Sequence, residues 1–302
     1  MPTEPRQDVL YRELSQLQAK EQTVAISPLI QEVVNFATGA FVRCMSYSKA
    51  AENVDLAPFA LHRHVMEMTD AVEVLLANAC PVAAIPLLRS SFEAVLYLEF
   101  IVEDPEVYER RSLTWLASYV RKRLASYESL LGSSPRGQDF LESIERDKTI
   151  REFPLPPQSM VEPAVQNLRH LLARVQFTEI MAEFASAGGF PNWYSLFDGP
   201  SNLRELARHL HLHAQYDVLY RQWSLATHAQ DFSPFIATGP DGEKGIRGLR
   251  DVAPTKEVAT FAVVFLLNAT RLLIGRFHPG EPWGNWYMRE VRDRFMTIVR
   301  RE

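Results

Sequence analysis

The chain has 302 residues, of which 47% are hydrophobic and 23% are charged, a composition typical of folded globular proteins. Lys and Arg together number 32 against 37 Asp and Glu, so the formal net charge is -5. This balance provides no global attraction for nucleic acid or for an anionic membrane, and a polyanion would have to be bound locally. DNA and membrane partners are therefore not predicted.

The cysteines and the apolar segments indicate the compartment. Cys44 and Cys80 form no CxxC pair, so neither a disulfide scaffold nor a cysteine zinc site is expected. The first residues contain no apolar core of the signal-peptide type, and the longest apolar stretch, 261–267, is much shorter than a membrane span. We therefore expect a cytoplasmic protein.

Apolar residues recur at helical spacing along most of the chain, for example over residues 29–41 and 61–76. No segment shows the convincing alternation of a strand, and Gly and Pro cluster between the periodic segments. These patterns predict an all-α fold, a multi-helix bundle of about eight to ten helices.

Two helical features stand out within this bundle. Residues 81–100 are apolar nearly all round, which predicts a central helix, with Pro86 causing a kink or a start near Ile85. The last two helical stretches, 256–276 and 283–300, are joined by a segment rich in Pro and Gly, so they should form an antiparallel pair.

The domain organisation follows from the composition of the middle of the chain. Residues 132–199 are richer in proline and polar residues, which indicates a helical insertion. We therefore predict one helical domain over 1–302, with its core formed by about 28–131 and 200–302. The Gly-rich segment 239–248 follows no strand and lacks a Gly-Lys-Ser/Thr ending, so it is expected to be a surface loop.

The segment 216–228 carries the most informative polar pattern. At about 100° per residue, one face of a helix would hold Asp217, Arg221, Ser224 and His228. Arginine suits phosphate and histidine exchanges protons near neutral pH, so the pair could cleave a phosphodiester without metal. His228 would act as base or acid, and Arg221 would stabilise charge on the phosphate. The same pattern also fits a structural stripe in which Arg221 pairs with Asp217.

Arg89 and Glu93 are spaced four residues apart on the predicted central helix. Charges in such apolar surroundings are expected to be paired, because an isolated buried charge is very costly. They either pair with each other or orient the Arg221 and His228 stripe.

Histidines form a further candidate group. Pairs spaced three or four apart can share a helix face, but a di-metal bundle would carry Glu-x-x-His motifs, which do not occur around these histidines. A structural or surface role is the favoured interpretation. The group comprises His62, His64, His209, His211 and His213, with Glu67, Glu93 and Glu205 as candidate co-ligands.

The segments LLRSSFE at 87–93 and YRQWSLATH at 220–228 together resemble an uncharacterised bacterial all-helical domain family, over about residues 60–228. Its pattern is an Arg and a Glu on an early helix and a Tyr, a Ser and a His on a late one. The spacing of Arg221 and His228 is also similar to the Arg-x(4 to 6)-His signature of the HEPN superfamily, which includes metal-independent ribonucleases of toxin and antiphage systems. Gln222 departs from the Asn, His or Asp that commonly follows the arginine.

The resemblance implies Arg221 and His228 as the catalytic pair, with Arg89, Glu93, Asp217, Tyr220 and Ser224 in support. It further implies RNA as the partner, a homodimer and no cofactor. The leading hypothesis is therefore a metal-independent endoribonuclease or an RNA-binding component of a toxin or antiphage defence system. Two alternatives stay open: a non-catalytic helical scaffold or sensor, and a metal-dependent helical-bundle enzyme.

Overall fold

The computed structural model describes residues 3–48, 53–132, 135–227, 235–238, 241–280 and 282–299. Helices form nearly all of its regular structure, so the predicted all-α class is confirmed. The chain divides into two compact units, the first formed by 1–105 with 204–302 and the second by 106–203.

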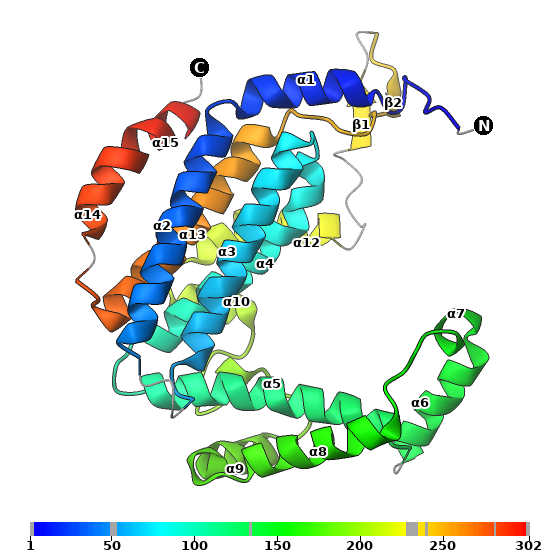
Figure 1. Ribbon diagram of the computed structural model, residues 1–302, viewed down its shortest axis with the longest axis vertical. Helices are drawn as coiled ribbons and strands as arrows, with labels where there is room; N and C mark the ends of the chain where they lie inside the picture. The colour runs from blue at the N-terminus through cyan, green and yellow to red at the C-terminus, as the bar shows by residue number, and fades with distance from the viewer. Residues whose placement is uncertain are drawn as a thin grey trace. The chain divides into compact units, whose positions relative to one another are not determined.

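Four long helices form the core of the first unit, and Figure 1 shows them side by side. They are α2 (Ile26–Ser46), α3 (Leu56–Ala77), α4 (Pro81–Val102) and α13 (Thr255–Phe277). α13 contacts each of the other three, although it is far from them in sequence. The apolar stripes of α2 and α3 supply buried side chains such as Leu29, Val33 and Val72, as their helical spacing predicts.

The central helix α4 begins at Pro81, so of the two outcomes expected from Pro86 the start near Ile85 is wrong, and the kink stays a prediction. Proline is well suited to the first position of a helix, where its missing N–H would have no partner. Pro86 lies inside the helix, in its second turn, and removes a hydrogen bond there. Buried residues such as Phe92 and Ala94, which lie on opposite sides of the helix, show that several sides of α4 are covered, and α4 contacts α3 and α13.

The core helix α13 is apolar enough to resemble a membrane span. An 18-residue window within it has a mean hydropathy of 1.9, so its apolar character extends well beyond the stretch 261–267. In the bundle 56% of that window is buried, and its inward side includes Ala262, Leu266 and Leu273. A buried core helix can have the same composition, and α13 packs against α2, α3 and α4.

Shorter helices complete the first unit, and two of them contain a π-helical turn. They are α1 (Arg12–Thr23), α10 (Leu203–His209), α11 (His213–Gln215), η4 (Tyr216–Tyr220, π), α12 (Arg221–Thr227), α14 (Trp283–Trp286), η6 (Tyr287–Val291, π) and α15 (Arg292–Val299). The described residues therefore contain more helical segments than the eight to ten expected, because short helices and π-helical turns subdivide the chain.

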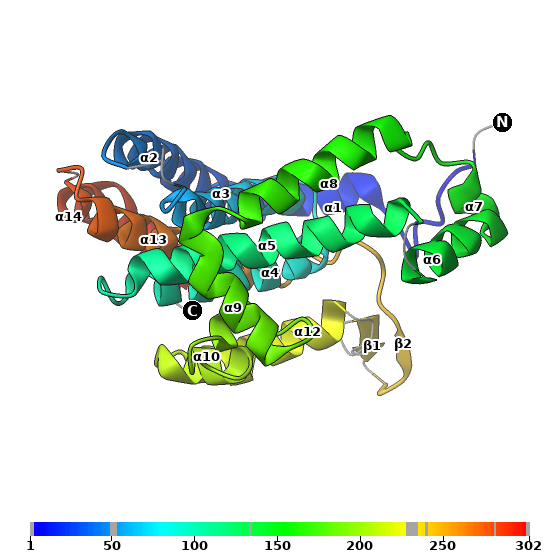
Figure 2. The same ribbon diagram turned by 90° about the horizontal axis from the view of Figure 1, so that it is seen from below.

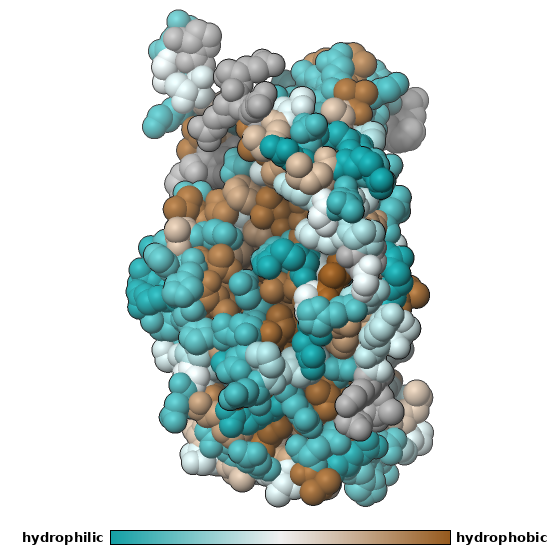
Figure 3. All heavy atoms as spheres, turned by 90° about the vertical axis from the view of Figure 1, so that its left-hand side faces the viewer, coloured by the Kyte–Doolittle hydropathy of each residue, from teal (hydrophilic) through white to brown (hydrophobic). Residues whose placement is uncertain are grey.

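The two C-terminal helical stretches, which the sequence predicts to form an antiparallel pair, are in contact in the structure. α15 contacts both α13 and α2. Trp286 stacks on Phe36 with ring centroids 3.7 Å apart, and its indole N–H donates to Glu32 Oε1 at 2.8 Å. Figure 3 views the face that carries α14 and α15, where apolar side chains interrupt the polar surface.

A small hairpin follows α12 in the sequence. β1 (Ile236–Thr238) pairs antiparallel with β2 (Lys244–Ile246), and Ile236 lies opposite Ile246. The sequence predicted a surface loop over 239–248 and no strand. Strands of three residues are too short to show a recognisable alternation, which explains the miss.

The second unit is built around α5, along which α8 runs in Figure 2. Its elements are α5 (Tyr108–Leu130), α6 (Pro135–Arg146), α7 (Lys148–Arg151), α8 (Gln158–Leu172), η2 (Val175–Phe177), α9 (Thr178–Ala187) and η3 (Trp193–Ser195). The unit begins at Glu106, ahead of the segment 132–199, because α5 supplies the surface on which α8 and α9 pack. Arg121 lies over the buried ring of Phe184, 4.0 Å from its centroid.

Candidate functional site

A polar network joins the central helix α4 to the π-helical turn η4. Arg89 Nη2 donates a hydrogen bond to Tyr220 Oη at 3.0 Å, and Tyr220 Oη donates to Glu93 Oε1 at 2.7 Å. Arg89 Nε also lies 3.4 Å from Glu93 Oε1, in the i, i+4 arrangement predicted from the sequence. The structure therefore brings the two predicted charges together with a tyrosine from a distant helix.

Aromatic rings surround the hydroxyl of Tyr220. Its ring stacks on Tyr216 with centroids 4.9 Å apart and lies 5.8 Å from the ring of Phe92. The Arg89 guanidinium is 5.0 Å from the Tyr220 ring centroid, within the range of a cation–π contact. Tyr220 is only 8% exposed, so the network is partly shielded from water.

The surroundings of Tyr220 and Arg89 raise the pKa of both groups. Burial raises the pKa of Tyr220 to about 12, with the hydrogen bond to Glu93 adding to the rise and that from Arg89 opposing it. Burial lowers the pKa of Arg89, but its hydrogen bond to Tyr220 and the charge of Glu93 outweigh this effect and raise it. Arginine, neutral tyrosine and carboxylate thus form a charge-assisted chain, the stronger kind of hydrogen bond.

The helix that carries Tyr220 is fixed at a second point by Trp223. This residue of α12 is buried and packs edge-on against Phe261 and Phe265 of α13, with centroids 5.4 and 5.9 Å apart. Tyr220 and Trp223 are spaced three apart, so both lie on the side that faces the bundle. Their packing leaves the opposite side of α12 to solvent.

Arg221 and Asp217 lie on this outer side. The Arg221 side chain is 67% exposed, and its Nη1 is 3.9 Å from Asp217 Oδ1. Asp217 Oδ2 accepts a closer bond, at 3.2 Å, from Arg204 of α10. Ser224 is partly buried, and His228 lies outside the described residues. The juxtaposition of Arg221 and His228 therefore stays a prediction.

The candidate histidines do not gather at one place. His64 Nε2 is 2.7 Å from Ser90 Oγ, while His209 Nε2 is 2.7 Å from Glu103 Oε1. Among the residues that the structure describes, no group of three or more His, Cys, Asp or Glu side chains is placed to hold a metal ion. The structural interpretation of these histidines is the one that the contacts favour.

His62 is a buried core residue. Its Nε2 lies 3.0 Å from Thr270 Oγ1 of α13, and its ring stacks on Phe41 with centroids 5.8 Å apart. Complete burial lowers the pKa of His62 to about 3, so the imidazole is neutral in the folded protein at neutral pH. The residue contributes to packing between α3 and α13.

Two partners in this region were missed by the sequence analysis. Arg204 pairs with Asp217 from a separate helix, and Glu103 pairs with His209 across 106 positions. Neither contact leaves a local spacing signal, because each joins different helices. The partner of Arg204 can be identified only from the tertiary structure, which places α10 beside η4.

These features define an all-helical protein with an Arg–Tyr–Glu network beneath an exposed arginine. The chain belongs to DUF5677, a family of unknown function, whose model matches residues 55–243. The matched region contains both the network and Arg221, which confirms the resemblance to an uncharacterised helical family and carries no link to the HEPN superfamily. No curated protein and no solved structure matches the chain.

Proposed function

We propose that the protein is a HEPN-like metal-independent endoribonuclease, or an RNA-binding component of a defence system, acting through Arg221 and His228. The observation that carries the proposal is the placement of Arg221. It extends to solvent from a helix that Tyr220 and Trp223 fix to the bundle, and its Nη1 lies 3.9 Å from Asp217 Oδ1. An anchored helix with an exposed guanidinium is suited to binding a phosphate.

In this mechanism Arg221 holds the scissile phosphate and stabilises the negative charge that develops during the reaction. His228 either removes the proton of the attacking ribose 2′-hydroxyl or protonates the leaving oxygen. One imidazole cannot perform both steps at once. A homodimer that brings two copies of the motif together would supply the second histidine, in agreement with the dimers of HEPN relatives.

The test is cleavage of a mixed-sequence RNA in the presence of EDTA. We expect cleavage by the unmodified protein and a loss of about 100-fold or more in Arg221→Ala and in His228→Ala, as for removal of a charge-stabilising or acid–base group. Arg63→Ala is the matched control, because Arg63 is also 67% exposed and has an i+4 acidic partner, Glu67. Absence of cleavage, or equal cleavage by all variants, would overturn the catalytic proposal.

A non-catalytic scaffold or sensor is the second candidate. The network of Arg89, Tyr220 and Glu93 favours it, because these contacts tie α4 to η4. This alternative expects no RNA cleavage and equal growth of cells that overexpress the unmodified protein or His228→Ala. A metal-dependent enzyme is the third candidate, and elemental analysis of the purified protein would test it.

A further inference from the structure

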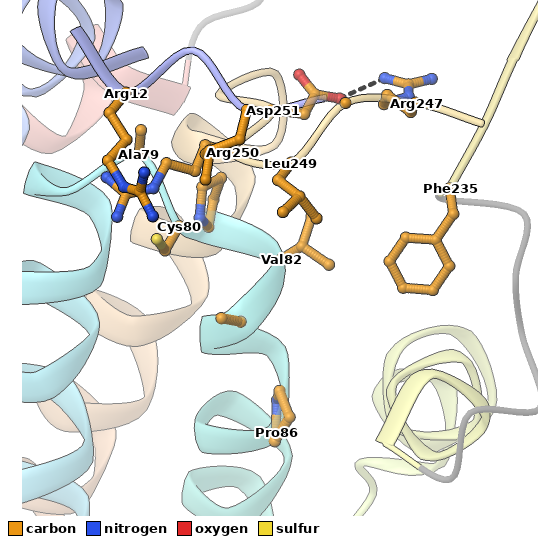
Figure 4. A pocket seen from close by; sticks show the side chains of 14 residues that line it. Arg12, Ala79, Cys80, Val82, Pro86, Phe235, Arg247, Leu249, Arg250 and Asp251 are labelled. Atoms are coloured by element: carbon orange, nitrogen blue, oxygen red, sulfur yellow. Dashed lines mark hydrogen bonds and ion pairs between the residues drawn. The ribbon is translucent and has the colours of Figure 1, made fainter. Parts of the chain in front are cut away.

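The first unit contains a cavity of about 580 Å³ beside the N-terminal end of α4. Figure 4 shows its walls, which come from the start of α1, the turn between α3 and α4, the first turns of α4 and the segments flanking the hairpin. Most of the lining is apolar, including Leu10, Val82, Pro86, Phe235 and Leu249. Its size and apolar character are those of pockets that bind small organic molecules.

Positive charge is concentrated in this otherwise apolar cavity. Its charged lining residues are Arg12, Arg247, Arg250 and Asp251, which leaves an excess of two positive charges. Arg247 forms an ion pair with Asp251, so that pair is internally neutralised. Figure 4 shows Arg12 and Arg250 directed toward the same side of the cavity, near Cys80. An anion placed there would interact favourably with both guanidinium groups.

The backbone around the cavity is held in an uncommon conformation at two positions. Ala79 and Arg250 have φ values of 60° and 63°, in the left-handed region that residues other than glycine rarely adopt. Arg250 Nη1 donates to the carbonyl of Asn78 at 3.1 Å, and Ala79 packs against Ala19 and Val252. Strained positions of this kind cluster at ligand sites, where the surrounding structure maintains them.

We propose that this cavity binds an amphipathic organic anion, with its apolar body along α4 and its carboxylate against Arg12 and Arg250. A purely polar ion would offer the apolar walls no partner, and a neutral hydrocarbon would offer the two guanidinium groups none. A medium-chain carboxylate has both required parts. The cavity shares no residue with the network or with Arg221, so this inference does not depend on the proposed ribonuclease activity.

Isothermal titration calorimetry with decanoate, below its micelle concentration, is the first test. We expect saturable binding to the full chain, with binding at least tenfold weaker for decan-1-ol and for acetate. The double variant Arg12→Ala/Arg250→Ala should bind decanoate at least tenfold more weakly. Arg6→Ala should bind normally, because Arg6 lies in the same N-terminal segment but pairs with Asp8 outside the cavity.

The two cysteines report where the ligand binds. Cys80 lines the cavity, whereas Cys44 is fully buried, at 0% exposure. Bound decanoate should therefore slow alkylation of Cys80 by neutral iodoacetamide, measured by mass spectrometry. Ala83→Trp, on the exposed side of α4 within the cavity wall, should abolish binding while the circular dichroism spectrum stays unchanged.

Three results would overturn the inference: no heat of binding together with no protection of Cys80, equal affinity in the double variant, or equal binding of decan-1-ol. The ribonuclease proposal is tested separately, since Arg221→Ala should leave decanoate binding intact. Absence of RNA cleavage with retained decanoate binding would overturn the ribonuclease proposal alone. Absence of decanoate binding with retained RNA cleavage would overturn the cavity proposal alone.

Discussion

The helical segment 213–227 has a buried side and an exposed side, and the neighbouring residues Tyr220 and Arg221 lie on opposite sides. Tyr220 is 8% exposed and links Arg89 to Glu93. Arg221 is 67% exposed, and its Nη1 lies 3.9 Å from Asp217 Oδ1, a long distance for an ion pair. The inner side thus holds the helix in place, and the outer side presents charge to solvent. Two adjacent residues of one sequence motif can therefore have different roles: Tyr220 is structural, and Arg221 is the candidate functional residue.

The largest expected change in the free energy of unfolding comes from removing Tyr220, on the buried side of the segment. Tyr220→Ala deletes a buried ring and both hydrogen bonds, so we expect the free energy of unfolding to fall by about 3–5 kcal/mol. Urea unfolding monitored by circular dichroism measures this change. Tyr220→Phe keeps the ring and should cost about 1–3 kcal/mol. A neutral Tyr220→Phe would mean that the hydrogen-bonded network contributes nothing to stability.

His62, a buried histidine elsewhere in the core, should make the free energy of unfolding depend on pH. The pKa of His62 is lowered to about 3, so between pH 6.5 and 3 the unfolded chain binds a proton that the folded chain does not. Stability should therefore fall with decreasing pH, by about 1.4 kcal/mol between pH 7.5 and 5.5 from this residue. His62→Gln should remove that component of the pH dependence in urea titrations. His213→Gln, at an exposed position, is the control and should leave it unchanged.

The smallest expected effect on stability is at the outer side. Arg221→Ala should change the free energy of unfolding by about 0.5 kcal/mol or less, because exposed ion pairs contribute little. Thermal and urea unfolding of this variant beside Tyr220→Phe test the contrast directly. A loss above about 1 kcal/mol would show that Arg221 is structural and would favour the scaffold interpretation.

The sequence predicts the long helices well, because α2, α3 and α13 each carry apolar residues at helical spacing over many turns. It also predicts the pairing of Arg89 with Glu93, since both lie on one helix four residues apart. Of the two outcomes expected from Pro86, a start of α4 near Ile85 is wrong, because the helix already begins at Pro81. A proline in the second turn leaves the remaining hydrogen bonds of the helix intact.

Features formed by distant segments escape such reasoning. Tyr220 meets Arg89 across 131 positions, and only the family resemblance, not any spacing, indicated a role for it. The π-helical turn at Tyr216–Tyr220 has no pattern that the sequence analysis could use. The cavity combines residues near positions 10, 80, 235 and 250, whose proximity depends on the tertiary fold.

The position of α13 in the chain has a consequence for biosynthesis. α2, α3 and α4 leave the ribosome first, and the helix that covers their shared apolar surface begins at Thr255, long after α4 ends at Val102. At translation rates of about 5–20 residues per second, the incomplete bundle waits on the order of 10 s or more for its last core helix. During this interval its uncovered surface is a natural substrate for ribosome-associated chaperones, and rare codons between these helices would prolong that exposure.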